Sequence, residues 1–285
     1  MPNYLLPEED GLLMRSAGPW AAIKLDYLAR YIDVFETAMR THWPIRNFID
    51  LMAGPGKNRV RETKAVLMGS PLLALNTKFP FTGYYFVDND IKILEALTQR
   101  CNASPNCSKV NIMKGDCNLV VDSIVTNLKK SERQSLNLTF LDPEGLELKW
   151  QTVAKIASIR KMDLIINYPQ GGLNRQMNLQ VNVKPLTPID NFFGGVEWRT
   201  IYKKWQNKKG LHRRLLDLYR LKLENLGYQE ILGADEISSE PLIRNTKRAP
   251  LYRLLFASKD PLGIDFWKKV IRRDVHGQSQ MSLPL

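Results

Sequence analysis

Apolar residues recur along the chain with two different spacings. Residues 20–42 place apolar side chains three and four positions apart, among them Ile23, Leu28, Ile32 and Phe35, which predicts an amphipathic helix. We expect this helix to pack on a sheet edge. Short apolar runs typical of buried strands follow at five places: Asn47–Met52, Gly83–Val87, Lys109–Met113, Leu136–Leu141 and Asp163–Asn167.

Helical patterns lie between these runs. They cover Pro71–Thr77, Ile91–Asn102, Asn118–Lys130 and Lys149–Arg160. Short buried strands that alternate with helices favour right-handed crossovers and a parallel sheet with both faces covered. The sequence therefore predicts an α/β fold with a Rossmann-like, mostly parallel, doubly wound sheet.

The alternation stops in the second half of the chain. Residues 170–209 are rich in glycine and proline, and we predict a long, irregular insertion on the substrate side of the protein. A helix is predicted over Leu211–Leu226, strands over Tyr228–Leu232 and Leu251–Ser258, and a basic helix over Ile264–Arg273. The last strand follows a helix and a short strand, so we expect it to run antiparallel at the sheet edge.

These elements divide the chain into five predicted segments. They are a lead-in with an accessory helix (1–44), a cofactor-binding core (45–169), the insertion (170–209), the completion of the core with the basic helix (210–275) and a loose tail (276–285).

Composition predicts a class of partner and a cellular compartment. The 285 residues include 41 Lys and Arg against 29 Asp and Glu, a net charge of +12 that favours a polyanion such as nucleic acid. Cys101, Cys107 and Cys117 lack the spacing of a metal site, so we interpret them as reduced structural thiols. No apolar run approaches the about 20 residues needed to span a bilayer, and the N-terminus has no signal pattern, which predicts a cytoplasmic protein.

The most informative motif is a glycine turn after the first core strand. The segment Asp50-Leu51-Met52-Ala53-Gly54-Pro55-Gly56 follows a buried strand, and its small residues let the backbone approach a ligand closely. Asp50 at the strand end could meet the amino group of a cofactor that carries an amino acid. The turn matches neither GxGxxG nor the GxxxxGK[ST] phosphate loop.

Three further strand ends carry a carboxylate: Asp88, Asp116 and Asp142. In open α/β sheets ligands bind at these carboxyl ends. Asp88 is placed to accept both ribose hydroxyls of an adenosine, and Asp116 to accept from an adenine amino group. S-adenosylmethionine offers a diol, an amino group and an ammonium, all of which donate to carboxylates. We therefore predict that Asp50, Ala53, Gly54, Gly56, Asp88 and Asp116 bind S-adenosylmethionine.

Asp142-Pro143 is the candidate for chemistry. A polar residue followed by proline at the fourth strand is typical of amino-methyltransferases, where it holds a planar amino group and exposes the nitrogen lone pair. An aromatic residue usually comes next, but this chain has Glu144. Tyr168, in Asn167-Tyr168-Pro169 at the end of the fifth strand, could supply the missing ring. Asp142, Pro143 and Tyr168 are thus the predicted catalytic residues.

Several of these motifs together resemble the three-Cys-motif partner protein family. The resemblance rests on the segment from Phe48 to Gly56, on Gly69-Ser70-Pro71-Leu72-Leu73-Ala74-Leu75 as its most specific part, and on shorter matches at the other strand ends and at Phe192-Phe193-Gly194 with Trp198. It extends from about Trp20 and Lys24 to Trp267. The resemblance implies a Rossmann-like fold, cofactor binding and a three-Cys-motif protein as partner. It implies no substrate.

A basic and aromatic cluster is the candidate surface for nucleic acid. It interleaves Trp198, Tyr202 and Trp205 with cations, and the predicted contacts are Arg199, Lys203, Lys204, Lys208, Lys209 and Arg213. Smaller basic groups occur at Arg59 and Arg61 and at Arg244, Lys247 and Arg248.

We therefore predict a methyltransferase that acts on DNA or RNA, with a base nitrogen favoured as acceptor and no metal. Two alternatives remain open at this point: a non-catalytic, cofactor-binding subunit of a complex, and a metal-dependent nuclease that uses acids such as Asp116, Asp142 and Glu144.

Overall fold

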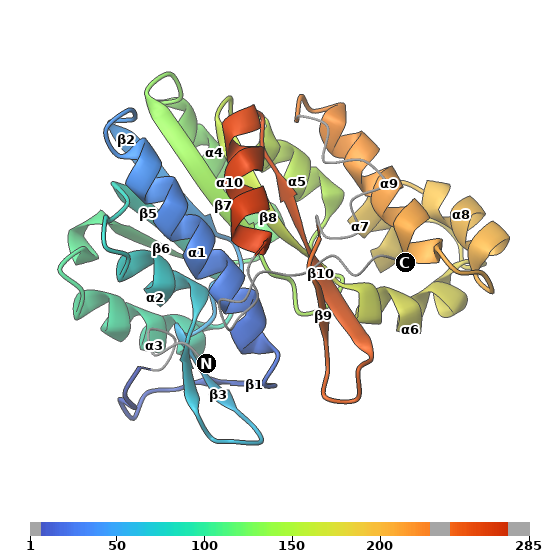
Figure 1. The fold of residues 1–285 in the computed structure, drawn as a ribbon, viewed down its shortest axis with the longest axis horizontal. Helices are drawn as coiled ribbons and strands as arrows, with labels where there is room; N and C mark the ends of the chain where they lie inside the picture. The colour runs from blue at the N-terminus through green and yellow to red at the C-terminus, as the bar shows by residue number, and fades with distance from the viewer. Residues whose placement is uncertain (1–6, 229–239, 273–285) are drawn as a thin grey trace.

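A seven-stranded sheet forms the centre of the protein, with helices on both faces (Figure 1). The structure is a computed structural model and describes residues 7–228 and 240–272. The strands lie in the order β6 (Val110–Lys114), β5 (Gly83–Asp88), β2 (Ile45–Asp50), β7 (Ser135–Leu141), β8 (Met162–Tyr168), β10 (Pro250–Ala257) and β9 (Leu242–Arg244).

The first five strands in this order are parallel, whereas β10 is antiparallel to both of its neighbours. The predicted Rossmann-like, mostly parallel fold is confirmed. The predicted antiparallel pairing at the sheet edge is also confirmed: β10 pairs with β9, which is the outermost strand and was not itself predicted.

Two hydrophobic clusters fill the space between the sheet and its helices. On one face the cluster includes residues of α1 (Ala21–Met39), α2 (Ser70–Leu75), α3 (Ile91–Asn102) and α10 (Pro261–Ile271). On the other face it includes residues of α4 (Cys117–Lys129), α5 (Trp150–Ala157), α6 (Gln170–Gln180), α7 (Pro188–Phe193), α8 (Glu197–Trp205) and α9 (Leu211–Glu224). Strand side chains alternate between the two clusters, as the pleat of a sheet requires.

The helix α1 packs across one face of the sheet instead of along its edge, so that prediction is wrong. Its apolar stripe includes Leu28, Tyr31, Ile32 and Phe35, each at most 1% exposed. The Tyr31 ring lies 4.8 Å from the Phe256 ring on β10, and its hydroxyl donates to Asp163 at 2.7 Å. A stripe this completely buried needs a whole sheet face against it, because an edge would leave one side in water.

Residues 170–209 are helical, which corrects the prediction of an irregular insertion. They form α6, α7 and α8. The glycines and prolines mark helix ends: Thr187 caps α7 with Pro188 in its first turn, and Gly194 ends that helix at φ 66°. The predicted strand over Tyr228–Leu232 lies outside the described residues from 229 onward, as does the whole predicted tail.

A second, smaller sheet was not predicted. It joins β1 (Arg15–Ala17) to β3 (Lys57–Val60) in parallel, and β3 to β4 (Val66–Met68) in antiparallel. It thereby connects the chain before α1 to the segment directly after the glycine turn. No helix in the described ranges is long and apolar enough to cross a membrane.

Candidate functional site

A pocket of about 300 Å³ opens at the carboxyl ends of the parallel strands. The glycine turn after β2 forms one wall, the start of α1 and the strand β1 form another, and the ends of β7 and β8 form the third. Three predicted cofactor residues, Ala53, Gly54 and Gly56, line it, together with the predicted catalytic residues Asp142 and Pro143. Two predicted motifs that lie about 90 positions apart in the sequence therefore meet at one place.

The backbone of the glycine turn adopts conformations that favour glycine. Gly54 has φ 65° and Gly56 has φ 86°, both in the left-handed region. Gly69 approaches so closely that a Cβ at its position would lie 2.9 Å from the carbonyl oxygen of Gly56. Three glycines are thus needed to bring the turn and the start of α2 together.

Alanine at Gly54 is expected to weaken cofactor binding by about tenfold and to cost about 1 kcal/mol of stability. An added Cβ would meet only the Arg15 side chain, at 3.6 Å, so the stability cost comes from the backbone alone. The loss of affinity comes from a methyl group on the pocket wall. Gly210→Ala is the matched control, because Gly210 has φ 93° with nothing within 4 Å and lies before α9. Calorimetry and thermal unfolding of both variants test this, and equal cofactor affinities would contradict it.

Asp50 is a completely buried carboxyl at the end of β2. Its Oδ1 accepts a hydrogen bond from the Met52 amide at 3.1 Å, while Oδ2 has no partner. Burial raises the pKa of Asp50 to about 7, the Ser70 hydroxyl and Met52 amide oppose the rise, and the charges of Asp142 and Asp88 add to it. A buried, unpartnered oxygen is costly, and a cationic hydrogen-bond donor would relieve that cost. The position therefore suits an ammonium group.

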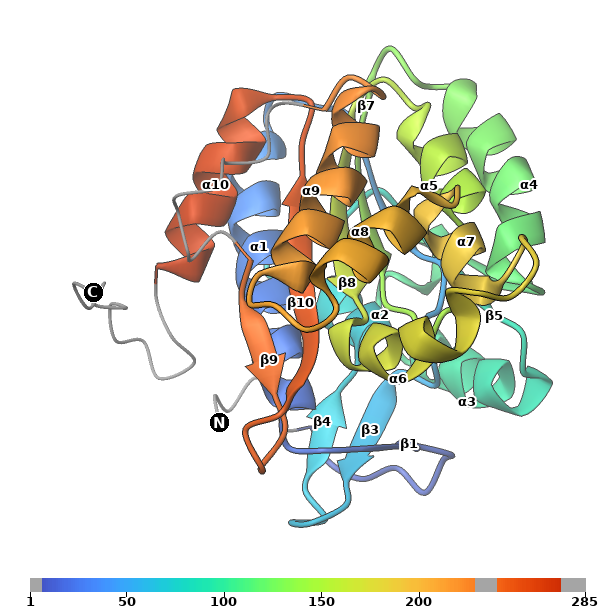
Figure 2. The same ribbon diagram turned by 90° about the vertical axis from the view of Figure 1, so that its right-hand side faces the viewer.

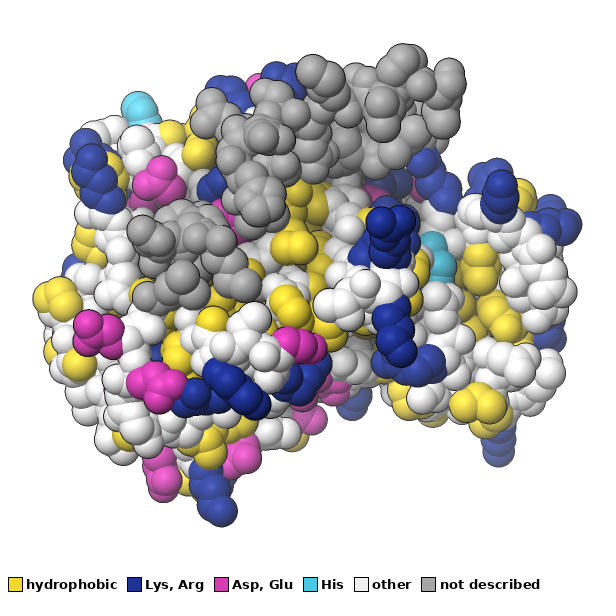
Figure 3. All heavy atoms as spheres, turned by 60° about the horizontal axis from the view of Figure 1, so that its bottom comes forward, with side chains coloured by type: hydrophobic (Ala, Val, Ile, Leu, Met, Phe, Trp, Pro, Cys, Tyr) yellow, Lys and Arg dark blue, Asp and Glu magenta, His cyan; other side chains and the backbone are white. Residues whose placement is uncertain are grey.

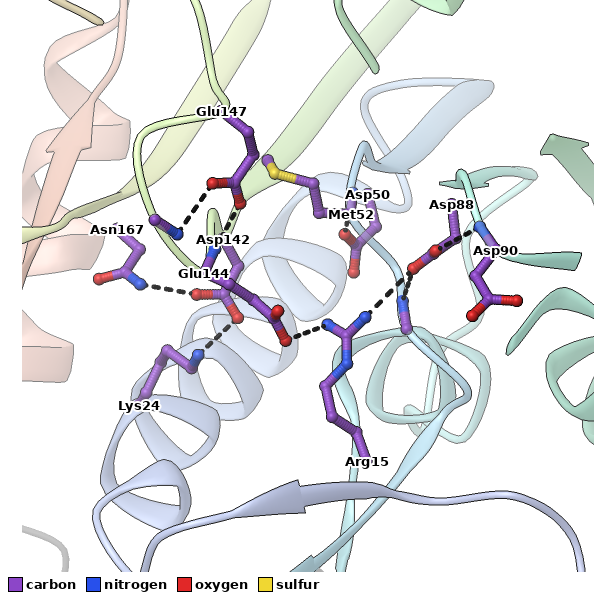
Figure 4. Close-up of polar contacts among 12 residues, drawn as sticks. Arg15, Lys24, Asp50, Met52, Asp88, Asp90, Asp142, Glu144, Glu147 and Asn167 are labelled. Carbon is purple, nitrogen blue, oxygen red and sulfur yellow. Dashed lines mark hydrogen bonds and ion pairs between the residues drawn. The ribbon is translucent and has the colours of Figure 1, made fainter. Parts of the chain in front are cut away.

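Asp88, at the end of β5, connects the glycine turn to the strand β1. Its Oδ2 accepts from the Gly54 amide at 3.1 Å and faces the Arg15 guanidinium at 3.5 Å. Figure 4 shows Arg15 lying between Asp88 and Glu144, which it reaches at 3.0 Å. The Arg15 side chain is 29% exposed and the Asp88 side chain 6% exposed. A ligand diol that replaced Arg15 would therefore have to donate hydrogen bonds to a largely buried carboxylate.

Asp142 is held from two sides (Figure 4). Lys24 Nζ, from α1, lies 2.5 Å from Asp142 Oδ2, and Asn167 Nδ2, from the end of β8, donates to Oδ1 at 2.8 Å. The Asn167 Oδ1 atom is buried and has no partner. Together Lys24 and Asn167 fix the carboxylate at the pocket, and Asn167 adds an acceptor. Sequence reasoning did not assign a role to either residue, although both occur in segments that it singled out.

The chain after Pro143 brings a carboxylate to the pocket instead of a ring. Glu144 lies where an aromatic residue was expected, and the backbone amides of Glu144 and Gly145 both donate to the Glu147 carboxylate, at 2.6 and 2.9 Å. Aromatic rings reach the pocket from elsewhere, as Trp20 and Tyr252 both line it. The Tyr252 ring lies under the Lys24 ammonium, 5.2 Å from its centroid.

Four predicted cofactor or catalytic residues do not line the pocket: Asp50, Asp88, Asp116 and Tyr168. Asp50 and Asp88 bond to the Met52 and Gly54 amides of its wall, whereas Asp116 and Tyr168 have no such contact. Tyr168 points to the opposite face of the sheet from Asn167, where it is fully buried and its hydroxyl lies 3.2 Å from His212 Nδ1. The pleat explains this, since neighbouring strand residues face opposite ways. Asp116 caps α4 by accepting from the Asn118 amide at 2.8 Å and does not line the pocket. We therefore assign no substrate contact to Tyr168, and the cofactor contact of Asp116 stays a prediction.

The predicted basic cluster on α8 is only partly available to a ligand. The Arg199 guanidinium binds Asp190 at 2.7 and 2.9 Å and the Val181 and Val183 carbonyls, and Trp198 is fully buried. These contacts join α6, α7 and α8. Arg213 is half-buried. The four predicted lysines are exposed: Lys203, Lys204, Lys208 and Lys209.

The acids proposed for a nuclease have separate partners. Asp142 binds Lys24 and Asn167, Glu144 binds Arg15, and Asp116 binds Asn118. Within residues 7–228 and 240–272, no three side chains of the kinds that bind metals are grouped to hold an ion.

No protein-family model and no curated protein matches the sequence. Among solved structures, a DUF519 protein from Legionella pneumophila has a TM-score of 0.47 and 13% identity, over 92% of this chain and 95% of that one. A candidate S-adenosyl-L-methionine-dependent methyltransferase from Methanococcus maripaludis has a TM-score of 0.33 and 13% identity, over 89% and 97%. Similarities this weak carry no functional argument, and none of them concerns three-Cys-motif partner proteins.

Proposed function

We propose that the protein is an S-adenosylmethionine-dependent methyltransferase that acts on a base nitrogen of a nucleic acid. The observation that supports the proposal is a group of polar side chains from neighbouring strand ends at one pocket. Asp142 and Asn167 line it, and Asp50 and Asp88 lie behind its glycine turn, where they accept hydrogen bonds from the Met52 and Gly54 amides of the pocket wall. The pocket volume lies at the lower end of the range for ligand sites.

The residues present fit this cofactor. Asp50 offers an unpartnered buried oxygen to the ammonium of the methionine part, and Asp88 offers its carboxylate to the ribose diol once Arg15 moves aside. The glycine turn presents the backbone of Ala53, Gly54 and Gly56 to the pocket, so the cofactor would lie against main chain there. When bound, S-adenosylmethionine supplies a methyl group on a positively charged sulfur.

The chain's own residues would orient the acceptor. Asp142 and the free Oδ1 of Asn167 accept the two hydrogens of a planar amino group, which leaves its nitrogen lone pair exposed. Lys24 is a positioning residue, because its ion pair holds the Asp142 carboxylate in place. Catalysis of this kind depends mainly on positioning.

Methyl transfer from labelled S-adenosylmethionine to bulk RNA, DNA and protein tests the proposal. We expect label in nucleic acid, released as an N-methylated base on hydrolysis. Label in protein alone would contradict the proposed substrate. Cofactor binding without transfer, even with a three-Cys-motif partner present, would instead favour the non-catalytic subunit.

A further inference from the structure

Two basic β-hairpins project from the edge of the protein at which the pocket opens (Figures 1 and 2). The hairpin between β3 and β4 carries exposed Arg61 and Lys64. The hairpin between β9 and β10 carries exposed Arg244, Lys247 and Arg248. We call them the first and the second basic hairpin.

The second basic hairpin carries uncompensated charge, whereas in the first Lys57 and Arg59 pair with Asp10 and Glu9, and Arg61 and Lys64 project from its turn. Residues 242–257, which form the second basic hairpin, contain no Asp or Glu, and the first contains one acid, Glu62. Arg244 Nη1 donates to the Arg248 carbonyl at 2.9 Å, which holds the second hairpin's turn. Figure 3 shows Lys and Arg side chains on both sides of a hydrophobic centre on this face. The face therefore attracts a polyanion toward the pocket.

Two aromatic rings lie between the hairpins at the pocket. The Arg61 guanidinium lies 5.7 Å from the Trp20 ring centroid, and the Tyr252 hydroxyl donates to the Trp20 carbonyl at 3.4 Å. Gly18 makes room for Trp20, since a Cβ there would lie 2.3 Å from the indole. Both rings are half-buried, so each keeps an accessible part. The first hairpin, the two rings and the second hairpin thus form one continuous band beside the pocket.

We propose that this band binds an unpaired stretch of RNA, with phosphates on the two hairpins and bases on Trp20 and Tyr252. The proposal rests on the proposed function and adds its substrate class. A base must leave any stack to reach Asp142, whose side chain is only 19% exposed. An unpaired base avoids the cost of unpairing and unstacking that a duplex would impose. Loops and single strands of RNA present such bases to aromatic rings.

The band fits this role better than the cluster on α8. That cluster lies on the opposite side of the molecule from β1 and β3 in Figure 1, and none of its residues lines the pocket. The ring of Trp205 in that cluster already contacts two cations of the protein itself. Lys208 Nζ and the Arg214 guanidinium lie 5.6 and 4.9 Å from its centroid. RNA bound there would not bring a base to Asp142.

Fluorescence anisotropy with a labelled single-stranded RNA of about 15 nucleotides tests the proposal. It needs no cofactor and no turnover. K247Q/R248Q is the test variant, and W20A removes one ring. K203Q/K204Q, on α8, and K129Q/K130Q, at the far end of α4, change charge equally elsewhere.

We expect K247Q/R248Q to weaken binding about tenfold and to lower the salt dependence by the equivalent of about two phosphates. W20A should weaken binding about fivefold with the salt dependence unchanged. The two control pairs should stay within about twofold. An equal or larger loss in K203Q/K204Q, no loss in K247Q/R248Q, or tighter binding of single-stranded or duplex DNA of the same sequence would overturn the proposal.

Calorimetry with S-adenosylmethionine separates the two claims. If RNA binds at the hairpins but the cofactor does not bind, the proposed function fails and the RNA surface stands. If the cofactor binds and K247Q/R248Q binds RNA normally, the surface fails and the proposed function stands.

Discussion

Asp50→Asn should lower the affinity for S-adenosylmethionine by at least about 100-fold, because it removes the buried negative charge that meets the cofactor ammonium. Breaking one side of a buried, hydrogen-bonded charge pair costs about 2–5 kcal/mol, and about 2.7 kcal/mol already corresponds to 100-fold. The side chain keeps its size and its Oδ1 acceptor, so the fold should survive. Calorimetric titration of both proteins measures the change.

The pH dependence of cofactor affinity adds a second readout. Burial raises the pKa of Asp50 to about 7 in the ligand-free protein, so below that pH a proton competes with the ammonium. Affinity should therefore rise about tenfold per pH unit from about pH 5 to about pH 7 and then level off. It should fall again above about pH 8, where the ligand amine loses its proton. Asp50→Asn should abolish the rise below pH 7.

Stability should change in the opposite sense. Because the folded-state pKa of Asp50 lies above its ordinary value, its stabilising contribution is complete at acid pH and is lost as pH rises through about 7. The unfolding free energy of the ligand-free protein should thus decline as the pH rises from acid values to about 7, and it should decline less in Asp50→Asn. Chemical denaturation at a series of pH values measures this directly.

Asp163→Asn is the matched control for Asp50→Asn. Asp163 is also a fully buried carboxyl, and burial raises its pKa to about 6, opposed by the Ser258 and Tyr31 hydroxyls. It lies near the amino end of β8, whereas the pocket lies at the carboxyl ends of the parallel strands. Its replacement should change stability and leave cofactor affinity within about threefold. Similar cofactor affinities in the two variants would show that Asp50 does not hold the ammonium.

Asp142→Ala should lower the rate of methyl transfer by about 100-fold to 1,000-fold and leave cofactor affinity within about threefold. The carboxylate that orients the acceptor is lost, whereas Asp50, Asp88 and the glycine turn stay in place. The fall should appear mainly in kcat. Single-turnover assays with labelled cofactor and saturating RNA measure it.

Two variants make the Asp142 result specific. Asp142→Asn keeps one acceptor oxygen and should retain more activity than Asp142→Ala. Asp122→Ala removes a carboxylate of the exposed pair with Lys155 on α4 and α5, and should have no effect. Full activity in Asp142→Ala would remove this residue from the proposed site.

The sheet and the glycine turn were predictable because the relevant signals are local. A strand buried on both faces reads as a continuous apolar run, and a helix as a period of 3.6 residues. The end of each apolar run then showed that Asp50, Asp88 and Asp142 follow the carboxyl ends of strands. The strands β3 and β4 gave no such signal, because they are three or four residues long and β3 reads Lys-Asn-Arg-Val.

The residues around Asp142 were not predictable in the same way. Lys24 precedes Asp142 by 118 positions, and only the packing of α1 across the sheet brings the two together. The choice between Asn167 and Tyr168 depended on which of two adjacent residues faces α1. A buried strand with apolar residues on both faces does not reveal that phase. The need for glycine at position 18 was likewise not predictable, because it depends on how closely the Trp20 indole packs against the Gly18 backbone.

The identity of the cofactor is the claim on which the rest of the account depends. Calorimetric titration of the protein with S-adenosylmethionine, S-adenosylhomocysteine and NAD tests it most directly. We predict saturable, one-to-one binding of both sulfur compounds, lost in Asp50→Asn, and no binding of NAD. Binding of NAD with neither sulfur compound bound would contradict the account.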